Sequence, residues 1–140
     1  TRVPAPPSDP VPFDPDCGRV RFGETEWHFQ GANHPNPPLL PTPQEAGPER
    51  ALLDPRYGPP PWRLRTPRQG ETVIPLGADG PLNLRGLLQR RGVPRFDRER
   101  MPVLVDRDDR VIWVPGVEVT EVGRLHLDTR RTIEVRMDRS

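Results

Sequence analysis

The sequence lacks most of the features that would give an isolated chain a chemistry of its own. It has one cysteine, Cys17, so an internal disulfide is excluded and a structural zinc site is not expected. It has no glycine-rich phosphate loop, no Ser-Gly-Gly pyrophosphatase loop and no Gly-x-Ser-x-Gly nucleophile motif. No run of 18 apolar residues is present, so no membrane span is expected. We therefore predict no catalytic and no metal-binding residues in this chain, and a reducing, cytoplasmic setting.

The histidines are also poorly placed for catalysis or metal binding. His28, His34 and His126 are scattered and form no H-x-x-x-H pair. His28 and His126 fall on polar positions of predicted strands, and His34 follows Asn33 in a proline-rich loop. Cys17, next to Gly18, is interpreted as a turn or packing residue.

Lysine is absent altogether, and all 21 basic residues are arginines. Genome composition can explain the choice of arginine, but it does not explain where the arginines lie. Residues 63–100 carry nine arginines and four acidic residues, whereas the segments on either side are slightly acidic. Because arginine binds phosphate bidentately, a local basic stretch in a nearly neutral chain indicates contact with a polyanion.

Proline is scarce in the second half of the chain and frequent in the first, where residues 1–62 hold 16 of the 22 prolines. Residues 1–12 and 33–48 are therefore predicted to be extended, and the first of these segments has a disordered linker as its alternative. Between them, apolar and polar residues alternate around Gly23, which predicts a β-hairpin. We divide the chain into a Pro-rich extended segment, 1–50, with a β-hairpin near 19–30, and a compact domain, 51–140. Since the chain starts at Thr1 without methionine, we expect it to be part of a longer protein.

Residues 51–140 predict an α+β fold of mostly antiparallel short strands with one main helix. Strands are expected at 62–65, 103–105, 111–114, 117–119, 125–127 and 133–137, and a short extended segment at 72–77. Residues 103–105 are apolar on both faces, which indicates a strand buried on both sides. Trp113, in the next apolar strand, is expected in the core.

The one convincing helix is predicted over 82–91. Leu84, Leu87 and Leu88 form an apolar stripe at helical spacing. Pro81 suits the first turn, and Gly92 suits the left-handed position after the last turn. A further single helical turn is expected at 98–100, with Asp97 just before it as the N-cap.

Several short motifs follow one another in a specific order between residues 51 and 136. They are ALLD at 51–54, LRTPRQGE at 64–71, PLG at 75–77, VPR at 93–95, RERMPVLVD at 98–106 and IWVPG at 112–116. Together they resemble the C-terminal domain of bacterial tRNA(Ile)-lysidine synthetases. The chain departs from that family at Gln69-Gly70-Glu71, where Pro-Gly-Asp is common, and at Asn83 and Gly92, where lysines are common.

This resemblance implies the α+β fold that the family shares with a domain of the phenylalanyl-tRNA synthetase β chain. It implies that the full-length enzyme ligates lysine to the wobble cytidine of an isoleucine tRNA, using ATP, in an N-terminal PP-loop domain that is missing here. ATP and Mg²⁺ are implied for that domain, and no cofactor for this chain. The implied partners are isoleucine tRNA, held on its acceptor-stem side, and the protein's own N-terminal catalytic domain.

The candidate RNA-binding residues are the arginines in and around the predicted helix. They are Arg65, Arg68, Arg85, Arg90, Arg91, Arg95, Arg98 and Arg100. Helical RNA is recognised mainly through phosphates, 2′-hydroxyls and shape, which suits arginine. Arg85, Arg90, Arg91 and Arg95 are predicted to form one exposed edge.

Alternatives to RNA contact remain at this level. Each arginine has a solvated position or an internal salt bridge as its alternative, and Phe96 and Trp62 stay open between packing and RNA contact. For the whole chain, the alternative is a protein-docking module of a multidomain tRNA-related enzyme with no direct RNA contact. A free-standing enzyme would need a convergent polar pocket, for which the sequence offers no candidate.

Overall fold

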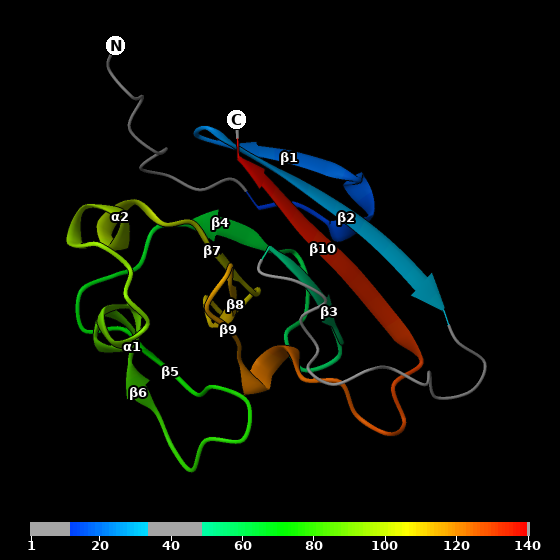
Figure 1. Cartoon of the computed structure of the whole chain (residues 1–140). Helices are drawn as coiled ribbons and strands as arrows, with labels where there is room; N and C mark the ends of the chain where they lie inside the picture. The colour runs from blue at the N-terminus through cyan, green and yellow to red at the C-terminus, as the bar shows by residue number, and fades with distance from the viewer. Residues whose placement is uncertain (1–11, 34–48, 140) are drawn as a thin grey trace.

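The computed structural model describes residues 12–33 and 49–139, and it is built around a long sheet, a shorter sheet and a pair of helices (Figure 1). The long sheet has the strand order β1-β2-β10-β3. Its strands are β1 (Arg19–Phe22), β2 (Thr25–Asn33), β3 (Arg50–Leu53) and β10 (Arg131–Arg139). The hairpin predicted near residues 19–30 is confirmed, and β2 continues to Asn33.

Strand β10 joins the two parts into which the sequence was divided. It pairs antiparallel with β2 along nine residues and with β3 on its other edge. Ile133, Val135 and Met137 are buried, as their alternation with polar residues predicts. Residues on both sides of position 50 therefore belong to one hydrogen-bonded sheet.

The shorter sheet lies between the long sheet and the helices. Its order is β4-β7-β8-β9, with β4 (Arg63–Arg65), β7 (Val103–Val105), β8 (Val111–Val114) and β9 (Glu118–Val119). Leu104 of β7 packs in the core shared with the long sheet, whereas Val103 and Val105 pack in a second core with α1. The strand is thus buried on both faces, as its sequence indicates.

The first core is rich in aromatic side chains. Trp27 and Trp113 meet edge to face with ring centroids 5.5 Å apart, and both are fully buried. The predicted core position of Trp113 is confirmed. Trp62 is also fully buried, and its indole N–H donates to the Gly58 carbonyl at 2.8 Å. The RNA-contact alternative for Trp62 is therefore wrong, because its ring faces the core.

Helix α1 (Leu84–Arg90) covers the outer face of the shorter sheet with its predicted leucine stripe. The helix begins two residues later than predicted. Leu82 and Asn83 form β6 (Leu82–Asn83), which pairs with β5 (Thr72–Val73), and the Asn83 side chain accepts from the Gly86 N–H at 2.9 Å. The expectation that Pro81 lies in the first helical turn is therefore wrong, because strand pairing holds Leu82 and Asn83 extended and the helix starts after Asn83, its N-cap.

Helix α2 (Arg95–Arg100) is longer than the single turn predicted. Pro94 precedes it without a side-chain cap, and Asp97 lies inside its first turn instead of capping it. Between the helices, Gly92 adopts φ 79°, the left-handed conformation predicted after the last turn.

The strand predicted at 125–127 is not formed. A 3-10 turn, η2 (Glu121–Gly123), and a loop occupy this region, and Leu127 is 93% exposed. A second 3-10 turn, η1 (Pro15–Cys17), precedes β1. Most of the extended segments predicted at 1–12 and 33–48, with His34, lies outside the described residues. Within residues 12–33 and 49–139, no helix is long and apolar enough to cross a membrane.

Candidate nucleic-acid interface

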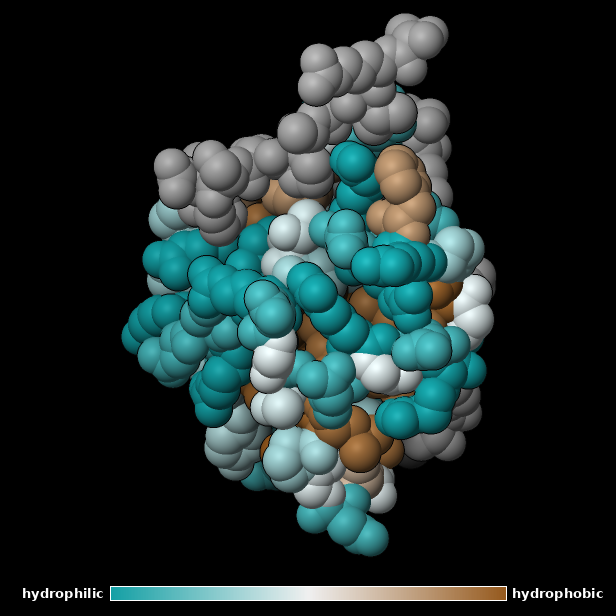
Figure 2. All heavy atoms as spheres, turned by 90° about the vertical axis from the view of Figure 1, so that its left-hand side faces the viewer, coloured by the Kyte–Doolittle hydropathy of each residue, from teal (hydrophilic) through white to brown (hydrophobic). Residues whose placement is uncertain are grey.

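Helices α1 and α2 form one outer face of the molecule, which Figure 2 turns toward the viewer. Because the leucines of α1 point inward, polar side chains cover this face. Figure 2 shows a largely hydrophilic surface with hydrophobic atoms visible in the gaps. The link between the helices is short, and the Val93 N–H donates to the Leu88 carbonyl at 3.0 Å. The basic residues of both helices are therefore held on a common support.

Five arginines on these helices have no carboxylate within ion-pair distance among the described residues. They are Arg85, Arg90, Arg95, Arg98 and Arg100, and we call them the unpaired arginines. Arg90, Arg95 and Arg100 are exposed, whereas Arg98 is half-buried. A guanidinium without an internal acceptor keeps its charge and its N–H donors for a ligand.

Most described arginines elsewhere are paired within the fold. The paired ones are Arg19, Arg50, Arg56, Arg65, Arg68, Arg91, Arg110, Arg124, Arg131 and Arg136. Away from α1 and α2, Arg21, Arg63, Arg107 and Arg130 also lack a carboxylate partner among the side chains described. The two helices therefore hold the densest group of available positive charge in the described parts.

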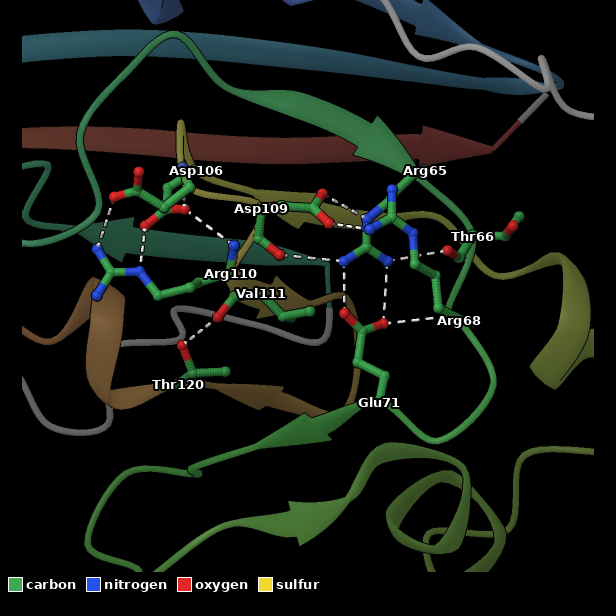
Figure 3. Close-up of polar contacts among 10 residues, drawn as sticks. Arg65, Thr66, Arg68, Glu71, Asp106, Asp109, Arg110, Val111 and Thr120 are labelled. Carbon is green, nitrogen blue, oxygen red and sulfur yellow. Dashed lines mark hydrogen bonds and ion pairs between the residues drawn. The ribbon is translucent and has the colours of Figure 1, made fainter.

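Arg65 is a structural residue, which corrects its prediction as an RNA contact. Its guanidinium is nearly fully buried between Glu71, just before β5, and Asp109, in the β7–β8 turn (Figure 3). It donates from Nη1 to Glu71 at 2.9 Å and from Nε to Asp109 at 3.0 Å. Arg68 is exposed but also pairs with Asp109. This cluster ties the turn after β4 to the shorter sheet.

The pKa of Arg65 shows that the cluster compensates for burial. Burial by itself lowers the pKa of the guanidinium, but hydrogen bonds and negative charge from Glu71, and then from Asp109, outweigh it and raise the pKa above its ordinary value. Arg65 thus remains charged inside the fold. Its charge is used internally and is not offered to a ligand.

Two members of the predicted exposed edge are also engaged with the fold. Arg91 donates to the Val117 carbonyl at 2.9 Å and pairs with Glu118 at 3.0 Å. Arg85 is half-buried, and its Nε is shielded from solvent without a hydrogen-bond partner. The expectation that Arg85 points fully away from the core is therefore wrong. Of the predicted edge, Arg90 and Arg95 are both exposed and unpaired.

The structure pairs Phe96 with an arginine, whereas the sequence alone leaves Phe96 open between packing and RNA contact. Phe96 is 64% exposed, and the Arg100 guanidinium lies over its ring, 4.3 Å from the centroid. The sequence feature that indicates this contact is the i, i+4 spacing of the two residues, which brings their side chains together on a helix. An exposed arginine–aromatic pair therefore lies among the unpaired arginines.

The described histidines and the cysteine lie on other elements. His28 approaches Asp138 at 3.0 Å on the long sheet, and His126 packs against Tyr57 with ring centroids 5.1 Å apart. Cys17 is exposed at the end of η1. In the ranges 12–33 and 49–139, no three His, Cys, Asp or Glu side chains are grouped to hold a metal ion.

Comparison with known proteins identifies relatives by sequence. The family model described as the TilS substrate C-terminal domain matches residues 62–134, more than half of the chain. The tRNA(Ile)-lysidine synthase of Geobacillus kaustophilus is 33% identical over 75 residues, covering 54% of this chain and 16% of that protein. The same enzyme of Symbiobacterium thermophilum is 37% identical over 81 residues, covering 58% and 17%. The match thus covers about one sixth of the length of these relatives.

Solved structures confirm the fold. A crystal structure of a TilS C-terminal domain matches with a TM-score of 0.66 and 23% identity, covering 94% of this chain and 90% of that one. An N-terminal fragment of the phenylalanyl-tRNA synthetase β subunit from Pyrococcus horikoshii matches with a TM-score of 0.53 and 22% identity, covering 63% and 27%. The predicted α+β class, with antiparallel strands and one main helix, is confirmed. This chain belongs to the TilS substrate C-terminal domain family, the C-terminal domain of tRNA(Ile)-lysidine synthases.

Proposed function

We propose that this chain is the C-terminal tRNA-binding module of a tRNA(Ile)-lysidine synthetase, and that α1 and α2 carry its RNA-contacting surface. The observation that carries the proposal is the group of unpaired arginines. Arg90, Arg95 and Arg100 are exposed on the same two helices without an internal carboxylate partner. Their charge is left for a polyanion, and an RNA backbone is the polyanion that the family relationship supports.

In the whole protein, this module works beside a separate catalytic domain. That domain ligates lysine to the wobble cytidine of an isoleucine tRNA, and the ATP and Mg²⁺ that the reaction needs bind there. The module holds the tRNA on its acceptor-stem side, away from the reacting nucleotide. The setting of this activity is the cytoplasm.

The two helices are held differently. The buried leucine stripe packs α1 against the sheet, and Arg91 at its end contacts the Val117 carbonyl and Glu118 of β9. Helix α2 buries none of its own residues, so its side chains stay accessible to a ligand. Contacts to phosphates fix the position and orientation of RNA without reading its sequence. The module therefore contributes affinity and placement, while identity is read elsewhere.

The proposal is tested with two variants that each remove four positive charges. One replaces Arg90, Arg95, Arg98 and Arg100 with alanine. The control replaces Arg50, Arg124 and Arg136, which are exposed, and Arg131, which is half-buried like Arg98. All four are ion-paired, and such surface pairs add little to stability. Binding of fluorescently labelled isoleucine tRNA is followed by anisotropy. The first variant is expected to lose most of its affinity, and the control to keep it.

Equal effects of the two variants would overturn the proposal, because only total charge would then matter. The docking alternative makes a different prediction. If the helix variant keeps its RNA affinity but no longer captures the separately produced catalytic domain, and bulk tRNA does not compete for that capture, the face is a protein-docking surface.

A further inference from the structure

A groove of about 500 Å³ lies beside α2, among segments far apart in the sequence. The β1–β2 turn at residues 22–25 forms one side, residues 92–102 form another, and the β8–β9 turn at 115–117 closes the third. Its volume is within the range of pockets that hold a small organic ligand. Of the unpaired arginines, Arg100 lines this groove.

The lining of the groove is mainly apolar, with an aromatic ring at its edge. Val93, Pro94, Met101 and Val117 contribute to its walls. Phe96 also lines it and is 64% exposed, an unusual amount for a phenylalanine in a folded domain. Arg100 lies over the ring of Phe96 and is itself part of the lining.

We propose that this groove binds one unpaired nucleobase of an RNA, stacked on Phe96 and Arg100, while the adjoining phosphates contact the arginines of α2. The inference rests on the proposed RNA-binding function and adds to it a binding mode that a duplex alone cannot use. Bases outside a duplex are bound by proteins through stacking on aromatic rings and on guanidinium planes.

The charges in and around the groove favour a nucleotide over other ligands. Arg100 lines the groove, and Arg95 and Arg98 lie on the same helix outside the lining; none of the three has an internal carboxylate partner among the described residues, so this helix attracts a polyanion. Glu24 and Asp97 also line the groove, and their carboxylates repel a phosphate there. A nucleotide satisfies both conditions, because its uncharged base enters the apolar groove while its phosphate stays at the basic rim. A purely apolar peptide or lipid would leave the arginines without partners.

The test uses a short RNA duplex in three forms: blunt, with a single-stranded extension at its 3′ or 5′ end, and with an abasic extension of equal length. The abasic form keeps the phosphates and removes the bases. We expect the natural extension at one end to raise the affinity about tenfold over the blunt duplex, within the range of base–aromatic stacking. The abasic extension should recover only the small electrostatic part of that gain.

The protein variants are Phe96→Leu, which keeps an apolar side chain without a π face, and Phe96→Trp, which keeps the π face. The matched control is Tyr57→Leu, because Tyr57 is 53% exposed and has Arg56 over its ring at 5.0 Å, outside the groove. Phe96→Leu should abolish the gain from the extension, whereas Phe96→Trp and Tyr57→Leu should keep it. Unchanged urea midpoints confirm that all three variants fold.

An extension that adds nothing at either end, or a gain that survives in Phe96→Leu, would overturn the groove proposal. If the parent chain still binds the blunt duplex in that experiment, the proposed RNA-binding function is retained and the groove proposal alone fails. If blunt-duplex binding is absent from the parent chain, the proposed function fails instead. Loss of catalytic-domain capture in Phe96→Leu, with RNA binding unchanged, would identify a protein segment as the occupant and also overturn the proposal.

Discussion

Replacing Glu71 with alanine tests whether Arg65 is a structural residue. The substitution removes both carboxylate oxygens that the buried guanidinium contacts, and also the acceptor of the Arg68 backbone N–H at 3.1 Å. Leaving a buried charge without its partner costs about 3–5 kcal/mol. Because Asp109 still contacts Arg65 at 3.0 Å and the Glu71 side chain is 12% exposed, we expect the lower end, about 3 kcal/mol.

The assay is urea unfolding, in which the midpoint should fall while the slope m stays the same. The double variant Glu71→Ala/Arg65→Met should recover most of the loss, because an apolar side chain replaces a buried ion pair at little net cost. Affinity for RNA should be unchanged in the double variant, since the Arg65 charge is used internally. A loss below about 1 kcal/mol in Glu71→Ala, or no recovery in the double variant, would refute this account of the cluster.

Three further changes test other parts of the fold. Trp113→Ala should cost about 3–5 kcal/mol in urea unfolding, because the side chain is fully buried, and a loss below about 1 kcal/mol would place it at the surface. The pKa of Glu121 is lowered from its ordinary value of 4.5, first by the Gly77 backbone N–H and then by Arg124. The contribution of Glu121 to folding stability should therefore be present above that value and be lost as the pH falls through the depressed pKa. Glu121→Gln should flatten that acid dependence, and an unchanged pH profile would contradict the assignment. Gly123→Ala would put a Cβ 2.6 Å from the Ile112 side chain and should lower the free energy of unfolding by about 1–3 kcal/mol. The control, Gly80→Ala, has open space around the new Cβ and should be nearly neutral. Equal effects of the two substitutions would argue against close packing at Gly123.

Local periodicity predicted most of the elements because each pattern reports burial directly. The alternation at Ile133, Val135 and Met137 became β10, and the leucine stripe became the buried face of α1. The boundaries were harder to predict. Leu82 and Asn83 were assigned to the helix, but pairing with β5 draws them into a strand. Such a choice depends on a partner strand that the local pattern does not contain.

Which arginines are available to a ligand was not predictable from charge clustering. Arg65 and Arg68 lie in the basic stretch, yet Asp109 reaches both from a turn more than 40 residues later. Arg91 is held by Glu118, which is 27 residues away. These pairs depend on how the β7–β8 and β8–β9 turns fold back toward the helices. The sequence therefore located the basic region, and the tertiary structure distinguishes its paired from its unpaired members.

The central claim, that the unpaired arginines of α1 and α2 contact RNA phosphates, is tested most directly by salt dependence. The dissociation constant of a duplex RNA is measured over a range of salt concentrations for single variants at Arg90, Arg95 and Arg100, with Arg50→Ala and Arg124→Ala as paired controls. Each contact releases counterions, so removing one contacting arginine should lower the slope of log K against log salt by about one. We expect that change for the three helix variants and none for the controls. Slopes that stay the same in the helix variants, or fall equally in the controls, would contradict the claim.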